Sequence, residues 1–140
     1  ALRDAGFKVD LQAMDWQTLV GRRASQEPPA NGGWNMFFTN FVSVDLLNPI
    51  VNNMVNGMGR EGGWFGWPEV PRAEELRNAY ALSTSLDEQK KIAEELQILA
   101  YDEVMYVPLG QFVSPSVWSS KLEGVNAAPA PLFWNVSKSE

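Results

Sequence analysis

Two helix signals stand next to each other in the middle of the sequence and constrain its fold more than any other feature. Pro71 has a fixed φ that suits the first turn of a helix, which we expect to continue over residues 72–83. Ser85 and Glu88 then form an S-x-x-E capping box, which opens a second helix over residues 86–104. In this second helix apolar residues recur at i, i+4 and i+7, the spacing of one apolar helix face. The sequence therefore predicts two consecutive helices with an apolar face to cover.

Strand-like segments precede and follow these helices. Residues 7–16 alternate between apolar and polar side chains, as a half-buried strand does. Residues 34–41 form a nearly continuous apolar run, which is typical of a strand covered on both faces, and residues 105–113 form another strand-like run. Asp15 can cap a short helix over residues 16–25. The order of these elements predicts an α/β fold with some parallel pairing of strands.

Composition excludes several classes of protein. The chain has 140 residues, of which 45% are hydrophobic and 20% charged, so it is long enough and apolar enough for one globular domain. It has no run of about 18 apolar residues, the length that a membrane-spanning helix needs. The net charge is −6 without a block of Lys or Arg, which argues against a nucleic-acid partner, because such binding depends on clustered cations.

The sequence contains no cysteine and no histidine. These absences exclude a disulfide framework, nucleophilic systems of the Cys–His or Ser–His–Asp kind, and a typical zinc site. We therefore expect no cofactor, no metal and no catalytic residue of these kinds.

An aromatic cluster lies in a glycine- and proline-rich stretch, EGGWFGWPEV, at residues 61–70. Trp64, Phe65 and Trp67 fall within four positions, although glycine and proline around them indicate a loop. Bulky rings prefer burial, so the cluster could plug a core. Aromatic side chains on loops also commonly line ligand clefts. Both interpretations, a plug and a wall, remain open from the residues alone.

Asp45 and Arg22 are the charged residues with the best case for a site. Asp45 follows the expected end of strand 34–41, and ligands of α/β folds bind beyond the C-terminal ends of strands. An aspartate can equally stabilise a turn at such a place. Arg22 closes the first short helix, where a cation suits the helix dipole, and it could instead contact an anion or another lobe.

The sequence also contains G-x-G-x-x-G, at Gly57, Gly59 and Gly62. A dinucleotide site needs this motif directly between a strand and a helix, and the stretch EGGWFGWP that follows cannot open a helix. We therefore reject a nucleotide site. Two carboxylates beside tryptophans could suit a glycosidase, and this alternative stays open.

Residues 1–6 resemble the last turn of a helix, with Gly6 at the position that favours a left-handed residue. The sequence starts without Met and without a signal peptide. We expect these 140 residues to be part of a longer protein that carries any targeting signal upstream.

The order of several motifs resembles a known family. LRDAGFKVDLQAMDWQTLVGRR is followed by GGWNMFFTNFVSVDLLNPI, then by GWPEVPRAEELRNAY and the second helix, then by MYVPLGQF and finally by LEGVNAAPAPLFWNV. In this order they resemble the C-terminal part of the dipeptide/oligopeptide/nickel class of extracytoplasmic solute-binding proteins, which feed ABC importers. The resemblance covers essentially the whole chain.

The resemblance implies a two-lobed periplasmic-binding-protein fold that closes on its ligand, with a mixed sheet flanked by helices in each lobe. Residues 1–113 would form most of one α/β lobe, and residues 114–140 would cross to the other lobe, which these residues lack. It also implies a binding protein, not an enzyme, in the periplasm or another extracytoplasmic space. Its partners would be a small-molecule or peptide ligand, the permease subunits in the membrane and the N-terminal lobe of the same chain.

Peptide-binding members often carry an aromatic-x-x-Asp pattern, whose Asp meets the α-amino group of the ligand. Phe41 falls at the aromatic position, Val44 takes the place of that Asp, and Asp45 lies one position beyond it. A peptide is therefore one possible ligand, and a neutral, sugar-like, opine-like or other small polar ligand is equally allowed. The residues that we expect to face the cleft are Phe41, Ser43, Asp45, Trp64, Phe65 and Trp67, with Arg22 as a further candidate.

Two functions of another class remain as alternatives. One is a fragment of a carboxylate-based glycosidase, which needs two carboxyl groups facing each other across a groove. The other is a sugar-binding module whose tryptophans stack on a carbohydrate.

Overall fold

The structure is a computed structural model that describes residues 1–128 and 131–139. The chain divides into two compact units, Ala1–Asn40 and Phe41–Glu140, which are described separately. The predicted C-terminal segment 114–140 includes residues 129, 130 and 140, and the prediction for these three positions lies outside the described residues.

The first unit contains one helix and one 3₁₀ turn. Helix α1 spans Trp16–Arg23 and begins directly after Asp15, whose carboxylate accepts hydrogen bonds from the amide of Thr18 at 3.0 Å and from its hydroxyl at 2.6 Å. These bonds satisfy amides that the first helical turn leaves free, and they confirm the predicted cap. The 3₁₀ turn η1 spans Pro29–Asn31.

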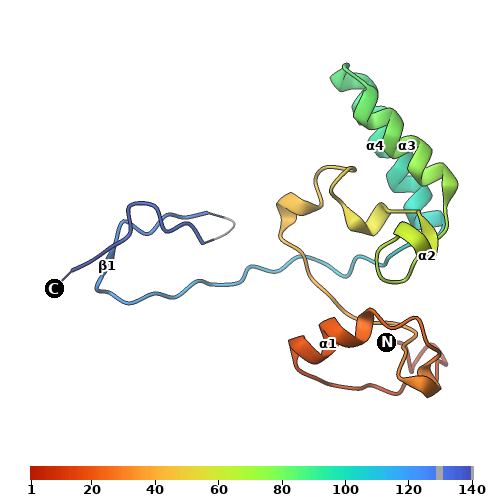
Figure 1. The fold of residues 1–140 in the computed structure, drawn as a ribbon, viewed down its shortest axis with the longest axis horizontal. Coiled ribbons are helices and arrows are strands. Elements are labelled where there is room, and N and C mark those ends of the chain that lie inside the picture. Colours follow the sequence, from red (N-terminus) through yellow and green to blue (C-terminus); the bar gives the residue numbers. More distant parts are fainter. Residues whose placement is uncertain (129–130, 140) are drawn as a thin grey trace. The chain divides into compact units, whose positions relative to one another are not determined.

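The core of the second unit lies around two helices that pack side by side (Figure 1). Helix α3 spans Pro71–Leu82 and helix α4 spans Leu86–Asp102, so both predicted helices are confirmed. The buried apolar residues are Val55, Val70, Ala73, Leu76, Leu96 and Ala100. They come from both helices and from the segments directly before α3, so the helix pair organises this unit.

The start of α4 differs in detail from a capping box. The Ser85 hydroxyl accepts a hydrogen bond from the Glu88 amide at 3.4 Å, as expected. The Glu88 carboxylate, however, accepts from the Ser83 hydroxyl at 2.7 Å, and the Ser85 amide donates to Ser83 Oγ at 3.3 Å. In a capping box the Glu88 carboxylate would accept the hydrogen bond from the Ser85 amide, and in this structure the Ser83 hydroxyl accepts it instead.

Short elements complete the second unit. Before α3 lie the 3₁₀ turns η2 (Ser43–Asp45) and η3 (Asn53–Val55) and the one-turn helix α2 (Gly59–Gly62). Strands β1 (Leu122–Glu123) and β2 (Ser137–Lys138) pair antiparallel. Among the described residues this two-stranded sheet is the only one, so the structure is mainly helical with little β structure.

The predicted strands over residues 7–16, 34–41 and 105–113 were wrong as secondary structure. These segments are irregular in the described part of the chain and pair with no second strand. Phe7 and Leu11, which alternation assigned to a covered face, are 63% and 70% exposed. The physical reason is that alternation fixes side-chain direction, whereas a strand also needs a neighbouring backbone to donate and accept its hydrogen bonds.

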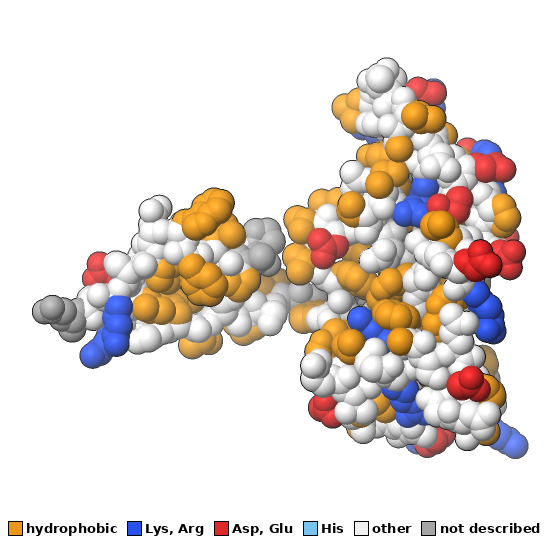
Figure 2. All heavy atoms as spheres, in the orientation of Figure 1, with side chains coloured by type: hydrophobic (Ala, Val, Ile, Leu, Met, Phe, Trp, Pro, Cys, Tyr) orange, Lys and Arg blue, Asp and Glu red, His pale blue; other side chains and the backbone are white. Residues whose placement is uncertain are grey.

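Apolar side chains are therefore common on the surface (Figure 2). Every residue from 107 to 121 is exposed, including Val107, Leu109 and Phe112. Contiguous exposed apolar surface is typical of sites that contact another protein, a membrane or a ligand. Within the described ranges, no helix has the length and apolar character needed to cross a bilayer.

Candidate functional site

The aromatic loop, residues 57–70, is closed at its base by backbone hydrogen bonds. The Gly57 carbonyl accepts from the Val70 amide at 2.9 Å, and the Gly59 amide donates to the Pro68 carbonyl at 2.9 Å. Met58 and Glu69 form an antiparallel bridge between these two bonds. The loop thus leaves and rejoins the unit at one fixed place, directly before α3.

Four aromatic rings form a continuous row in this unit. The ring centroids of Phe41 and Trp64 lie 5.4 Å apart, those of Trp64 and Phe65 4.9 Å apart, and those of Phe65 and Trp67 6.4 Å apart. All four side chains are partly buried. The structure thus brings four of the predicted site residues together, neither as a fully buried plug nor as a fully exposed wall. Their role as ligand contacts stays a prediction.

Trp67 adopts an unusual backbone conformation. Its amide donates to the Trp64 carbonyl at 2.8 Å, which closes a turn, and Gly66 within this turn has φ +106°. Trp67 itself has φ +47°, a left-handed conformation that costs a residue with a side chain roughly 1–2 kcal/mol. Such a conformation persists only where surrounding contacts fix it, and it often occurs at functional sites.

Ser43 and Asp45 lie on the turn η2, a few residues after Phe41. The Asp45 amide donates to the Val42 carbonyl at 2.9 Å, and both Ser43 and Asp45 are exposed. The Asp45 carboxylate is in no hydrogen bond or ion pair within the described part of the chain. It is therefore available to accept a hydrogen bond from an external donor.

Arg22, in the first unit, has a local structural role. Its guanidinium donates to the Gly32 carbonyl at 3.2 Å and to the Gly33 carbonyl at 2.9 Å, and it also donates to the side chain of Gln12. These bonds tie α1 to the turn that follows η1. At least three of its donors are thus engaged within this unit, and its role as a ligand contact stays a prediction.

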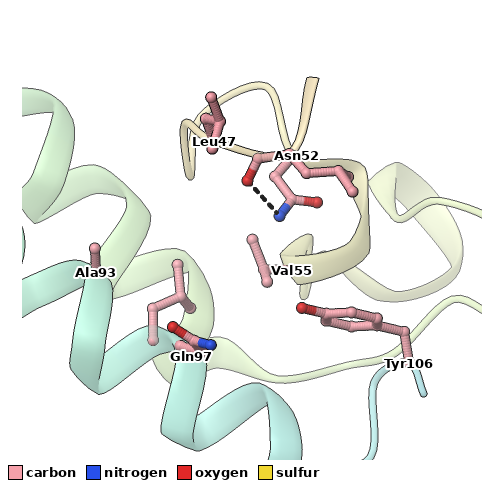
Figure 3. Close-up of a pocket in the computed structure, with 8 residues that line it drawn as sticks. Leu47, Asn52, Val55, Ala93, Gln97 and Tyr106 are labelled. Carbon is pink, nitrogen blue, oxygen red and sulfur yellow. Dashed lines mark hydrogen bonds between the residues drawn. The ribbon is translucent and has the colours of Figure 1, made fainter. Parts of the chain in front are cut away.

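A small hollow of about 200 Å³ lies between the loop after η2 and helix α4 (Figure 3). It is lined by Leu46, Leu47, Asn52, Val55, Ala93, Leu96, Gln97 and Tyr106. The side-chain amide of Asn52 is already hydrogen-bonded within the protein. Its Nδ2 donates to the Leu46 carbonyl at 3.3 Å, and its Oδ1 accepts from the backbone amide of Met54 at 2.9 Å. The Tyr106 hydroxyl points inward in Figure 3, and burial, with a smaller contribution from Tyr101, raises the pKa of Tyr106.

Two residues that the sequence did not single out hold the loops in place. Glu74 accepts a hydrogen bond from the Gly57 amide at 2.8 Å, and its carboxylate pairs with Arg77 at 2.6 Å. Arg77 in turn donates to the carbonyls of Pro49 and Ile50, at 3.0 and 2.9 Å. In the sequence an opposite-charge pair at i, i+3 resembles any solvated helix face, so no local signal distinguishes it.

The G-x-G-x-x-G motif lies at the start of the aromatic loop. It follows the turn η3 and ends in the four-residue helix α2, and no strand directly precedes it in the described chain. This setting lacks the strand and the long helix that a dinucleotide site requires, so the rejection of such a site is supported. Among the described residues, no group of three or more acidic side chains could hold a metal ion.

No protein-family model matches the chain. Over 137 residues, 98% of its length, the chain is 38% identical to a probable peptide ABC transporter periplasmic-binding protein of Sinorhizobium fredii. The chain is thus similar, along nearly its whole length, to a part of one such binding protein. The resemblance seen in the sequence is thereby confirmed. The chain spans 26% of the length of this relative, which its name describes as a binding protein.

Proposed function

We propose that the chain is part of a protein that captures a peptide or another small polar solute and delivers it to the permease of an ABC importer. The observation that carries the proposal is the 38% identity, along 98% of the chain, to a probable peptide ABC transporter periplasmic-binding protein. The protein would act in the periplasm or another extracytoplasmic space, after export by a signal peptide. Its work would be binding, without catalysis.

The second unit offers the groups that such binding needs. The ring row from Phe41 to Trp67 can remove the apolar parts of a ligand from water, and polar groups nearby can fix its orientation. Asp45 and Ser43 are exposed and supply a carboxylate and a hydroxyl. A carboxylate in a closed cleft is stable only when it is paired, so Asp45 favours a ligand with an ammonium or a hydroxyl group.

The rest of the longer protein would supply a second lobe and close the cleft as a hinged pair. The mixed sheet flanked by helices that the resemblance implies would then include strands from outside these residues. Residues 114–140 would cross to the other lobe. The exposure of every residue from 107 to 121, with its apolar side chains, supports this proposal.

The carbohydrate-active alternatives receive less support. The similarity along nearly the whole chain is to a binding protein, which favours capture over glycoside hydrolysis. A sugar-binding module remains distinguishable by experiment, because its ligand would be a glycan.

Native mass spectrometry of the full-length protein, purified without denaturation, tests the proposal by identifying a ligand that is carried along. We expect a peptide or another small polar solute with a cationic or hydroxyl group. A co-purified oligosaccharide would support the carbohydrate alternative instead, and a protein that carries no ligand and shows no heat of binding with short peptides would contradict the proposal.

Calorimetry with the identified ligand then tests Asp45. Loss of a hydrogen bond to a charged group costs about 1.5–3 kcal/mol, so Asp45→Ala should weaken binding about 10- to 100-fold. Glu94→Ala is the matched control, because Glu94 is also an exposed carboxylate but lies on α4 instead of the turn η2. Equal affinity in both variants would remove Asp45 from the site.

A further inference from the structure

We infer that Glu74 and Arg77 are positioning residues that hold the two loop segments of the candidate site in one fixed arrangement. The inference deepens the proposed function, and only its consequence for ligand binding rests on that function. Both residues lie on α3, on neighbouring turns of the same face, and neither touches the ring row through a contact described above. Their effect would be indirect, through the backbone groups that they bind.

Arg77 fixes the segment that follows Asp45. Its Nε donates to the Pro49 carbonyl at 3.0 Å and its Nη2 donates to the Ile50 carbonyl at 2.9 Å, while Nη1 pairs with both oxygens of Glu74. The Arg77 side chain is only 12% exposed, and its bonds to Pro49 and Glu74 are partly shielded from competing water, whereas the bond to Ile50 is exposed. A planar guanidinium presents N–H groups on three separate nitrogens to two adjacent carbonyls and a carboxylate, whereas lysine offers its three donors from a single nitrogen and does not reproduce that spacing.

The turn that Arg77 binds is connected to Asp45 through a short chain of contacts. Asn48 accepts from the Ile50 amide at 2.9 Å through its side chain and from the Asn52 amide at 3.0 Å through its carbonyl. The Asn52 side chain then donates to the Leu46 carbonyl at 3.3 Å, and Leu46 directly follows Asp45. The position of Asp45 therefore depends on this turn, and Arg77 binds the turn at the carbonyls of Pro49 and Ile50.

Glu74 fixes the aromatic loop at its first residue. Its Oε1 accepts the Gly57 amide at 2.8 Å and also the Nη1 donor of Arg77 at 2.6 Å. The Gly57 carbonyl accepts from Val70, at the other end of the loop, so one carboxylate anchors the base from which the rings project. The ion pair thus joins the Asp45 segment to the aromatic loop, and the contact between Phe41 and Trp64 joins them a second time.

Hydrogen–deuterium exchange of the full-length protein tests the inference without a ligand. In Arg77→Gln, peptides that cover residues 46–52 and 55–60 should exchange about tenfold faster, since loss of a hydrogen bond to a charged group costs at least the 1.4 kcal/mol of one decade. Arg72→Gln is the matched control. Arg72 also lies on α3 and pairs with Glu75 at 2.8 Å and Glu95 at 2.7 Å, but it is 53% exposed and binds no loop.

A second variant separates positioning from general destabilisation. Arg77→Lys can keep the pair with Glu74, but its single ammonium nitrogen does not reproduce the spacing with which the guanidinium meets both carbonyls. Residues 46–52 should therefore exchange faster while residues 55–60 stay protected. Equal exchange in Arg77→Gln and Arg72→Gln would overturn the inference, and so would uniform loosening of both segments in Arg77→Lys. A titration of the unchanged protein with tri-alanine tests the proposed function separately, and its failure would leave the exchange result intact.

Discussion

The rings of Phe41 and Trp64 lie with their centroids 5.4 Å apart and their planes inclined by 58°. Aromatic pairs at such a separation contribute about 0.5–1.5 kcal/mol beyond the burial of area, through the attraction between the ring quadrupoles. The contact joins the end of the first aromatic run to the glycine-rich loop. It therefore brings together two parts of the chain that the sequence separates, and both belong to the candidate site.

Trp64 should matter more for local order than for the global stability of the protein. Trp64→Ala removes its contacts with Phe41 and Phe65, so we expect a loss of near-ultraviolet circular dichroism from the ring row. Because Trp64 is only partly buried, the free energy of unfolding should fall by less than the roughly 3–5 kcal/mol of a fully buried aromatic residue. A urea titration measures this loss.

Trp118→Ala is the control for this change. When residues 1–140 are studied alone, Trp118 is exposed and lies in the segment after residue 107 that is exposed throughout, so its removal should change the stability of that chain by no more than about 0.5 kcal/mol. A near-ultraviolet spectrum that changes as much in Trp118→Ala as in Trp64→Ala would show that the ring row is not the source of the signal.

The local features of the fold could be predicted because their causes lie within a few residues. Asp15 accepts from Thr18, and Ser85 accepts from Glu88, each within one helical turn. Pro71 begins α3 as its fixed φ requires. Capping and helix spacing are short-range effects, so a single sequence contains the information that they need.

The sheet could not be predicted in this way. Phe7 and Leu11 alternate with polar neighbours, and yet both are exposed and the segment pairs with no other described strand. The pattern records which side chains would face a core, but it contains no statement of which backbone supplies the hydrogen bonds. Contacts between residues far apart in the sequence could not be predicted for the same reason. Nothing near Glu74 in the sequence indicates that its carboxylate accepts a hydrogen bond from the Gly57 amide.

Gly57 should tolerate no side chain. It is buried, and a Cβ at this position would lie 2.4 Å from the Val70 carbonyl oxygen, in the same residue whose amide donates to the Gly57 carbonyl and closes the aromatic loop. Gly57→Ala should therefore open the base of the loop and destabilise the protein by about 1–3 kcal/mol, as overpacking of a tight site does. Chemical unfolding and exchange of the amides near Val70 measure the two effects.

Gly21→Ala provides a matched control of opposite sign. Gly21 lies inside α1, and a Cβ there would have nothing within 4 Å. Alanine in the helix interior should stabilise the protein by about 0.5–1 kcal/mol. Destabilisation by the two alanines to a similar extent would mean that the close approach at Gly57 is not the cause.

Leu96 is the largest fully enclosed part of the core, with 2% of its surface exposed. Leu96→Ala should leave a cavity between α4 and the residues around it and cost about 2–5 kcal/mol. Ile98, on the same helix, is 55% exposed, and Ile98→Ala should cost no more than about 0.5 kcal/mol. The difference between the two free energies of unfolding measures how far this face of α4 is covered in the protein.

The outcome for Ile98 also bears on the proposed second lobe. If Ile98→Ala costs as much as Leu96→Ala in the full-length protein, the exposed face of α4 is covered by residues outside those described here. The helix pair would then be a layer between two other parts of the protein, and the assignment of Ile98 as a surface residue would be wrong.

Stability should fall at alkaline pH through Tyr106. Burial raises the pKa of Tyr106, with a smaller contribution from Tyr101, so the folded protein keeps this phenolic proton to a higher pH than the unfolded chain. Tyrosine has a pKa of about 10 in the unfolded chain, and below this pH the contribution of Tyr106 to the stability of the folded state is complete. The contribution is lost as the pH rises through the higher pKa that Tyr106 has in the folded protein. Urea titrations between about pH 8 and pH 11 measure the loss.

Tyr106→Phe removes the ionisable group and keeps the ring in the hollow beside Val55, so it should reduce the alkaline loss while leaving stability at neutral pH nearly unchanged. Tyr101→Phe is the control, because Tyr101 is exposed and is only the smaller cause of the shift. It should retain most of the alkaline loss. If Tyr106→Phe and the unchanged protein lose stability equally between these pH values, the Tyr106 hydroxyl is not shielded from water, and the hollow next to it is open in solution.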